Sequence, residues 1–256
     1  MMRRSAMAAV LVAAATLGGY AWFSGPADEA APTAAAPAPL YGSFPAEILN
    51  LAADAAGRAR SVHVAGTVES DTGPARYDVA NSLADGGRVT GSFEFGSGFV
   101  DLRVVGPEFY FRSDSRFWEP KVADPADIPR LAGRWVATET TRLEFAKLYG
   151  LSEFDPPRIA ALLRHLAGLA PNSLRRADGP LVGGRPTVEV SAGEPGSSEY
   201  LAVRVAATAP HLPLYLRVTG DDGMAVTLTG WNEPVTVTAP ENPVPVADVL
   251  QLMSRE

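Results

Sequence analysis

The chain has 256 residues, of which 46% are hydrophobic and 20% are charged, a composition typical of a globular protein with a substantial core. Its formal net charge is -7, and its basic residues form no cluster beyond two arginine pairs. Nucleic-acid binding is therefore not expected, because phosphate contacts need concentrated Lys and Arg. The absence of cysteine excludes disulfides, thiolate metal sites and lipid attachment to an N-terminal cysteine.

The N-terminal part of the chain carries the features of export. Two arginines precede residues 6–23, an uncharged apolar segment, and residues 24–43 form a linker rich in Pro and Ala. This pattern is typical of a secretory signal peptide, but the apolar segment is also long enough for a short membrane span. Residues 1–23 are thus either a cleaved signal peptide or an anchor in the cytoplasmic membrane. Either alternative predicts an extracytoplasmic folded domain, residues 44–256, at the end of a flexible tether.

The first part of this domain is predicted to be a helix followed by an antiparallel meander. Residues 44–59 have apolar positions at helical spacing. Residues 61–112 contain five segments with apolar residues at every second position, separated by turns that contain Gly, Asp or Pro. This alternation predicts strands that are apolar on one face. The residues assigned to that face are Val62, Val64, Val89, Phe93, Phe95, Val100, Leu102 and Val104.

The remaining elements alternate between a helical part and a second block of strands. After an irregular connection and a brief strand at residues 133–136, helices are predicted at residues 142–149 and 156–169. The second of these has Asp155 as its N-cap and a stripe formed by Ile159, Leu162, Leu163, Leu166 and Leu169. Strands are predicted again from residue 181, at residues 187–191, 200–206, 212–218, 225–231 and 235–237, before a terminal helix at 246–253. This order indicates one α+β domain with an antiparallel sheet.

The sequence contains no motif for catalysis or for metal binding. His63, His165 and His211 lie far apart and lack the spacing of metal ligands, and no nucleophile-elbow pattern is present. A nonstandard hydrolase site would have to combine His63 with Glu94 or Asp101, which share the polar face of the predicted strands. We expect instead that these side chains are solvated, and that the protein is not an enzyme and uses no cofactor or metal.

The order of these segments resembles the actinobacterial LppX/LprAFG-type envelope lipoproteins, which share a fold with the LolA/LolB lipoprotein carriers. The resemblance spans residues 44–253, and the stretches that carry it are SVHVAG at 61–66, FYF at 109–111, GRWV at 133–136 and WNEPVTVTAP at 231–240. It implies a strongly curved antiparallel sheet, an open half-barrel, with helices over its concave face and an apolar cavity for acyl chains between them. The chain departs from the family in lacking the lipidated cysteine.

The resemblance implies a noncatalytic, monomeric cell-envelope protein that binds or carries a lipid, glycolipid or other hydrophobic molecule. The expected lining of the cavity combines the apolar strand residues with four residues of the predicted helix, Ile159, Leu162, Leu163 and Leu166. The alternative is an extracytoplasmic binding or scaffold module whose centre is filled by its own side chains and which acts through protein contacts. Because a lipid pocket is lined like a core, the apolar pattern leaves both interpretations open.

Overall fold

The computed structural model describes residues 40, 42–69, 73–84, 87–96, 98–139, 154–168, 173–220 and 223–254. The strands are β1 (Ser61–Val68), β2 (Ala75–Ser82), β3 (Arg88–Phe95), β4 (Gly98–Val105), β5 (Glu108–Ser113), β6 (Trp135–Glu139), β7 (Leu174–Val182), β8 (Arg185–Ala192), β9 (Leu201–Ala206), β10 (Pro213–Val218), β11 (Met224–Thr229) and β12 (Val244–Pro245). The helices are α2 (Pro45–Arg58), α3 (Ser115–Trp118), the 3-10 helix η2 (Pro125–Arg130), α5 (Pro156–Ala167) and α6 (Val246–Met253).

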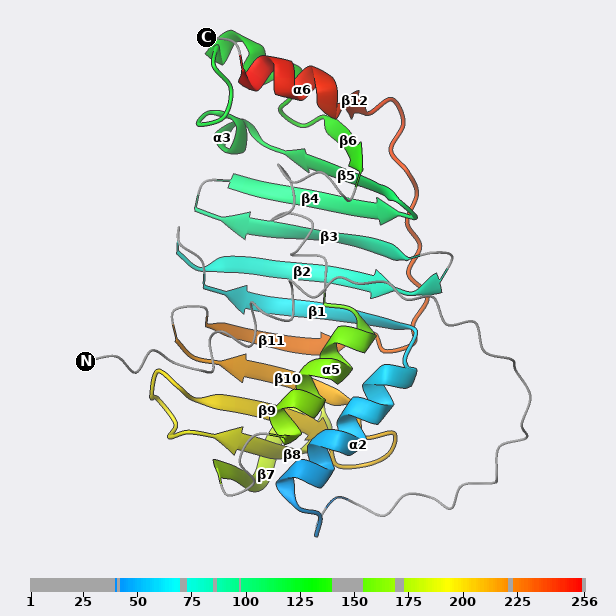
Figure 1. The fold of residues 1–256 in the computed structure, drawn as a ribbon, viewed down its shortest axis with the longest axis vertical. Helices are drawn as coiled ribbons and strands as arrows, with labels where there is room; N and C mark the ends of the chain where they lie inside the picture. Colours follow the sequence, from blue (N-terminus) through cyan, green and yellow to red (C-terminus); the bar gives the residue numbers. More distant parts are fainter. Residues whose placement is uncertain are drawn as a thin grey trace.

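All twelve of these strands belong to one sheet, in the order β12-β6-β5-β4-β3-β2-β1-β11-β10-β9-β8-β7 (Figure 1). Each neighbouring pair is antiparallel except β12 and β6, which pair in parallel through two residues. The two strand blocks meet where β1 pairs with β11. The prediction of an α+β fold with an antiparallel sheet is therefore confirmed for all but the short pair β12–β6, and so is the five-strand meander from β1 to β5.

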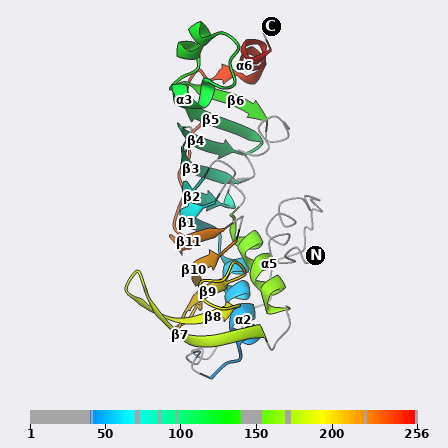
Figure 2. The same ribbon diagram turned by 90° about the vertical axis from the view of Figure 1, so that its left-hand side faces the viewer.

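The sheet is a long open band whose edges, β12 and β7, lie at opposite ends of the molecule (Figure 2). This differs from the strongly curved half-barrel that the resemblance implied. The two long helices lie over one half only: α2 packs on α5 and on β7 to β10, whereas α3 packs on β4 and α6 on β6 and β12. With α2 and α5 confined to one half, the sheet twists along its length instead of rolling up around them.

The register of the strands places the predicted apolar residues on one face, which we call the inner face because α2 and α5 lie on it (Figure 2). Directly opposed residues of antiparallel strands point to the same side of a sheet. Two rows of such residues cross β1 to β5: Val64, Val79, Gly91, Leu102 and Phe111 in one, and Val62, Asn81, Val89, Val104 and Phe109 in the other. The meander thus has a continuous apolar inner face.

Local sequence explains where α5 begins and how it packs. The carboxylate of Asp155 accepts a hydrogen bond from the backbone N–H of Arg158 over 2.8 Å, and Pro156 occupies the first helical position, where a missing N–H does no harm. The stripe residues at Ile159, Leu162, Leu163 and Leu166 are buried. The helices predicted at 44–59 and 246–253 are likewise confirmed as α2 and α6. The helix predicted at 142–149 and residue Leu169 lie outside the described residues.

Strand β7 was not predicted, because its sequence LRRADGPLV lacks a regular alternation of apolar residues. It is the edge strand of the sheet, and most of its side chains are exposed. Edge strands commonly carry charged residues and proline, which discourage further pairing. The sequence of β7 is therefore typical of an edge strand, and it has no apolar alternation from which a strand could be predicted.

The strand predicted at residues 235–237 is wrong. Residues 230–243 instead form an extended segment, which we call the strap, that links β11 to β12 and crosses the outer face of the sheet (Figure 1). The Arg88 Nη1 donates to the carbonyl of Val237 over 3.3 Å, and the Arg103 Nη1 donates to that of Thr238 over 3.0 Å. Its Val-Thr-Val-Thr sequence suits a strand, but the strands beneath it already pair on both sides.

Candidate functional site

The predicted ligand-binding residues lie together in one buried apolar cluster. The described strand residues Val62, Val64, Val89, Phe93, Val100, Leu102 and Val104 have exposed fractions between 0 and 9%. The four helix residues Ile159, Leu162, Leu163 and Leu166 have exposed fractions between 2 and 9% and belong to the same cluster. The side chain of Phe95 lies outside the described part of the structure. The structure thus joins the two predicted sets, and their role as a ligand lining stays a prediction.

Glycine occupies one position in the centre of the meander's inner face. Gly91 stands in the row between Val79 and Leu102, with Val89 and Phe93 before and after it in β3. A Cβ atom there would lie 2.3 Å from the carbonyl oxygen of Asp78 and 2.6 Å from a methyl carbon of Val79. Contacts that short do not occur in folded proteins, so β2 and β3 can approach each other in this way only with glycine at this position.

Two aromatic clusters stand on either side of this part of the inner face. In the first, the ring of Tyr77 contacts those of Phe93 and Phe154 edge-on, at centroid distances of 4.8 and 5.5 Å. In the second, on β5 and α3, the ring of Phe111 lies 5.8 Å from that of Trp118. The sequence analysis missed Tyr77, Phe154 and Trp118. Tyr77 does follow the alternation of β2, whereas the other two lie in irregular segments without a periodic signal.

Few polar groups are buried at the inner face, and two of them matter for what it can bind. Asn81 has an exposed fraction of 2%, and its side-chain amide donates to the carbonyl of Phe154, just before α5, over 3.1 Å. The indole N–H of Trp118 is buried and finds no hydrogen-bond partner in the part of the chain that the structure describes. Burial also raises the pKa of the Tyr77 phenol, which keeps this group neutral. A largely apolar surface with few buried polar groups suits a hydrophobic ligand.

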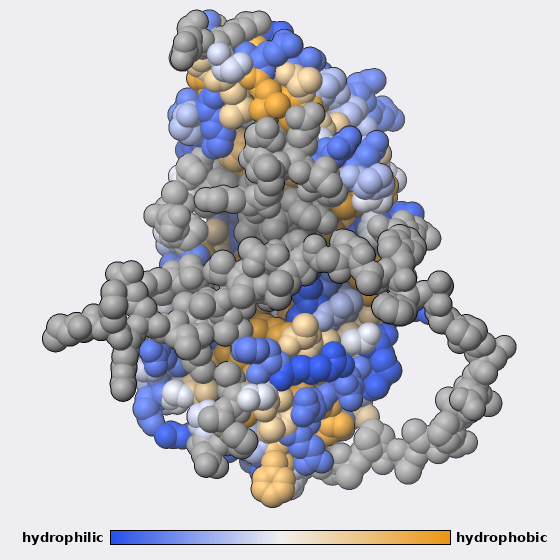
Figure 3. All heavy atoms as spheres, viewed as in Figure 1, coloured by the Kyte–Doolittle hydropathy of each residue, from blue (hydrophilic) through white to orange (hydrophobic). Residues whose placement is uncertain are grey.

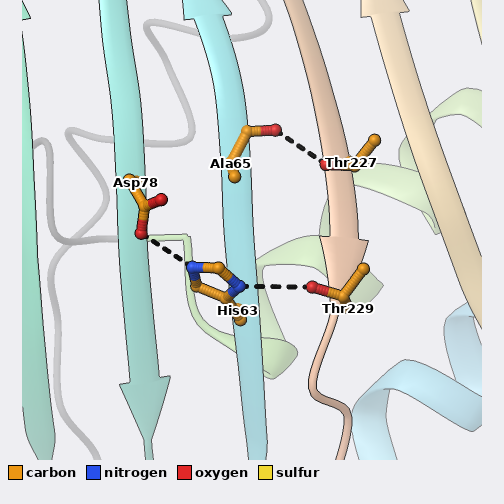
Figure 4. A network of polar contacts seen from close by, with 5 residues as sticks. All are labelled: His63, Ala65, Asp78, Thr227 and Thr229. Atoms are coloured by element: carbon orange, nitrogen blue, oxygen red, sulfur yellow. Dashed lines mark hydrogen bonds and ion pairs between the residues drawn. The ribbon is translucent and has the colours of Figure 1, made fainter. Parts of the chain in front are cut away.

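The outer face carries a polar network centred on His63 (Figure 4). The Nε2 of His63 lies 2.8 Å from a carboxylate oxygen of Asp78, and its Nδ1 lies 3.2 Å from the hydroxyl of Thr229. On the same face the Thr227 hydroxyl donates to the carbonyl of Ala65 over 2.9 Å. These groups come from β2, β1 and β11, so the network joins the two strand blocks where they meet.

The carboxylates that the hydrolase hypothesis required are engaged elsewhere. Asp101 accepts from the Nε of Arg112 over 3.0 Å, and Glu94 lies 3.9 Å from Arg76. His63 is paired with Asp78 instead, and its side chain is 37% exposed while that of Asp78 is 64% exposed. An imidazole between a carboxylate and a hydroxyl has the order of a catalytic triad, but water competes for each of these groups at this exposure. We interpret the network as cross-strand polar pairing on a solvated face.

A groove of about 510 Å³ lies beside this network, between the strap and β1 to β3. Its walls include His63, Thr90, Thr229 and the first residues of the strap, from Gly230 to Thr236. Within the described part of the chain, no three His, Asp or Glu side chains are grouped so that they could hold a metal ion. Of the other two histidines, His165 is exposed on α5, and His211 is buried with its Nδ1 3.1 Å from the carbonyl of Ala206.

The surface over α2 and α5 mixes hydrophilic and apolar side chains (Figure 3). Both helices are amphipathic, with their apolar stripes turned inward. In the described residues, no helix is long and apolar enough to cross a membrane. The N-terminal segment for which an anchor or signal peptide was predicted lies outside them.

The single twelve-stranded sheet with its helix-covered inner face defines an α+β fold for which comparison with known proteins finds a counterpart. LprF from Mycobacterium bovis matches with a TM-score of 0.52 at 16% sequence identity, over 77% of this chain and 96% of LprF. The chain therefore has the fold of LprF, and the resemblance to the LppX/LprAFG type is confirmed at the level of the fold. No family model and no curated protein sequence matches the chain.

Two further structures match with lower scores. A putative outer membrane lipoprotein-sorting protein domain from Vibrio parahaemolyticus gives a TM-score of 0.23 at 11% identity, over 77% of this chain and 96% of that domain. The MucA/MucB complex from Pseudomonas aeruginosa contains a chain that gives a TM-score of 0.32 at 17% identity, over 77% of this chain and 59% of that one. Scores this low carry no argument about fold or function.

Proposed function

We propose that this protein is a noncatalytic cell-envelope protein that binds or carries a lipid, glycolipid or other hydrophobic ligand against its inner face. The acyl chains of the ligand lie along Val89, Phe93, Val100, Leu102 and Val104. The apolar stripe of α5 belongs to the same buried cluster and continues the apolar surface towards the other half of the sheet. The observation that carries the proposal is the continuous apolar inner face of β1 to β5 in a chain with the fold of LprF.

The energetics of such a site need no specific polar contact. Moving one CH2 group from water into an apolar environment is worth about 0.8 kcal/mol, so several methylenes of an acyl chain suffice for stable binding. The predicted lining residues are aliphatic or aromatic, and none of them carries a charge. Selectivity for chain length or branching would then follow from the shape of the inner face.

Entry of a ligand requires an element to move, because the predicted lining residues are already buried. Helix α5 is the candidate. An ion pair between Arg164 on α5 and Asp54 on α2, 3.0 Å apart, ties the two long helices together, and both side chains are about half exposed. Exposed pairs of this kind contribute little to stability. Displacement of α5 would break this pair at little cost and expose the apolar stripe of the helix, which an entering acyl chain would cover again, and it would give acyl chains access to β2.

The proposal includes an extracytoplasmic location and a monomeric state. The apolar residues 6–23 and the Pro/Ala-rich linker predict export, with attachment to the cytoplasmic membrane if the segment is retained. A carrier tethered by a flexible linker could reach lipid at the membrane surface and release it within the envelope. No nucleic acid, cofactor or metal enters this proposal.

The alternative is a binding or scaffold module with a filled centre, and one observation favours it. The predicted lining residues have exposed fractions as low as those of an ordinary core. In that case the protein would act through its surface, and the groove beneath the strap would be the place to look for a partner. The two functions differ in whether the inner face accepts a molecule other than the protein itself.

Mass spectrometry of the full-length protein after gentle purification separates the two. A carrier is expected to retain lipid from its host, released on denaturation in about one equivalent per chain, and to take up a fluorescent fatty-acid probe that a natural lipid displaces. A variant with Leu102→Glu, which places a charge on the inner face, should lose both signals, whereas Arg103→Glu on the outer face should keep them. Absence of retained lipid together with absence of probe binding would rule out the carrier function.

A further inference from the structure

We infer that the indole N–H of Trp118 donates a hydrogen bond to the ester carbonyl of a bound acyl lipid. This inference rests on the proposed function and adds a polar contact to a site that is otherwise apolar. A hydrogen bond from the indole to the ester carbonyl would fix how far along the inner face the ligand lies.

The inference is based on the buried indole N–H of Trp118, which has lost its hydrogen bond to water without forming another in the described part of the chain. Trp118 is fully buried, at 0% exposure, and among the described residues its Nε1 has no hydrogen-bond partner. Large indole rings are used at buried positions where their N–H reaches an acceptor. Trp231 shows the ordinary arrangement in this protein: its Nε1 donates to the carbonyl of Pro213 over 3.1 Å. Trp118 is therefore an exception that calls for a partner from outside the chain.

Two aromatic rings pack against Trp118. Its ring lies 5.8 Å from that of Phe111, tilted by 34°, and 5.0 Å from that of Phe117, nearly perpendicular to it. An N–H directed at a ring is a weak hydrogen bond and compensates only part of the lost hydration. The backbone holds the residue in place, since the carbonyl of Trp118 accepts from the N–H groups of Lys121 and Val122. The donor is thus fixed in position by packing and by hydrogen bonds.

The position of Trp118 fits the end of a ligand on the inner face. Phe111, which touches Trp118, is the cross-strand partner of Leu102, one of the predicted lining residues. Trp118 is therefore one side chain away from the lining, at the end of the inner face that lies away from α2 and α5 (Figure 1). A chain of methylenes along β3 and β4 that ends near Phe111 would bring its ester carbonyl to the indole.

The test is a competition between two ligands that differ in the acceptor. The full-length protein is incubated in detergent with equal amounts of methyl palmitate and hexadecane, the unbound ligand is removed, and the bound ratio is measured by mass spectrometry. The preference of the wild type for the ester should fall about tenfold in Trp118→Phe, the effect of one hydrogen bond, with total bound ligand preserved. Trp231→Phe, which removes an indole that already has its partner, should keep the wild-type ratio.

A second measurement covers the case in which Trp118→Phe does not fold. The indole N–H signal of Trp118 in the 15N-labelled wild-type protein should move downfield on addition of methyl palmitate and stay in place on addition of hexadecane. An unchanged bound ratio in a folded Trp118→Phe protein, or an indole signal that ignores the ester while the ester binds, would overturn the inference and leave the carrier function standing. If neither ligand is retained by the wild type, the proposed function itself fails.

Discussion

The side-chain amide of Asn81 on β2 donates a hydrogen bond to the carbonyl of Phe154, the residue before the N-cap of α5, over 3.1 Å. Asn81 is almost fully buried within the inner face. The ring of Phe154 also contacts that of Tyr77, on the same strand as Asn81. One polar and one aromatic contact therefore hold the start of α5 over the meander. These contacts must break if α5 is displaced when a ligand enters.

Replacement of Asn81 should loosen this attachment. In Asn81→Ala the Phe154 carbonyl loses its donor, and a buried unsatisfied group of this kind costs about 1–3 kcal/mol in the free energy of unfolding. If α5 is the moving element, uptake of a fluorescent fatty-acid probe should also become faster. Denaturant titration and stopped-flow fluorescence measure the two effects. Asn50→Ala, at an exposed position of α2, is the control, and equal behaviour of the two variants would contradict this role of Asn81.

The second prediction concerns the N-cap of α5: two substitutions of Asp155 should differ in their effect on the free energy of unfolding. Burial raises the pKa of the Asp155 carboxyl, and the N–H and guanidinium of Arg158 offset this only in part. Asparagine can cap a helix without a buried charge, so Asp155→Asn should leave the free energy of unfolding close to that of the wild type. Asp155→Ala should lower it by about 1 kcal/mol, because the helix loses its cap. Thermal unfolding at neutral pH shows the difference, and equal loss in both variants would mean that the charge itself is needed.

Alkaline pH should destabilise the protein through its buried phenols. Burial and the neighbouring carboxylate of Glu108 raise the pKa of Tyr110 to about 12, whereas a phenol in an unfolded chain ionises near pH 10. Between these values the unfolded state loses a proton that the folded state keeps, so the free energy of unfolding falls as pH rises. The contribution is fully present below pH 10. Tyr110→Phe should make this decline shallower in denaturant titrations from pH 9 to 12, and an unchanged slope would refute the assignment.

Alternation made the meander readable from sequence. Val62 and Val64, or Val100, Leu102 and Val104, repeat at period two because one face of their strands is buried and the other is not. The start of α5 was equally readable, since Asp155 and Pro156 act within one turn of the helix. These features depend on neighbours in the chain, and a sequence displays them directly.

Features that depend on contacts between distant residues could not be read in this way. The sequence pattern placed His63, Glu94 and Asp101 on one polar face but could not show which side chains meet, and the strand register brings His63 to Asp78 and Thr229. The Val-Thr-Val-Thr stretch of the strap suits a strand but forms none, because the strands beneath it already pair on both sides. The packing of α2 on β7 to β10, far from it in the sequence, is likewise encoded by no local pattern.

The central claim, that acyl chains lie against the inner face, is tested most directly by photocrosslinking. A fatty acid with a diazirine in its chain is bound to the full-length protein and irradiated, and the labelled residues are identified by fragment mass spectrometry. Along β4, successive side chains point alternately to the inner and the outer face, so this one strand reports labelling of either face. Our account predicts label on Val100, Leu102 and Val104, competed away by unlabelled palmitate; label on Asp101 and Arg103 instead, or label that palmitate does not reduce, would contradict it.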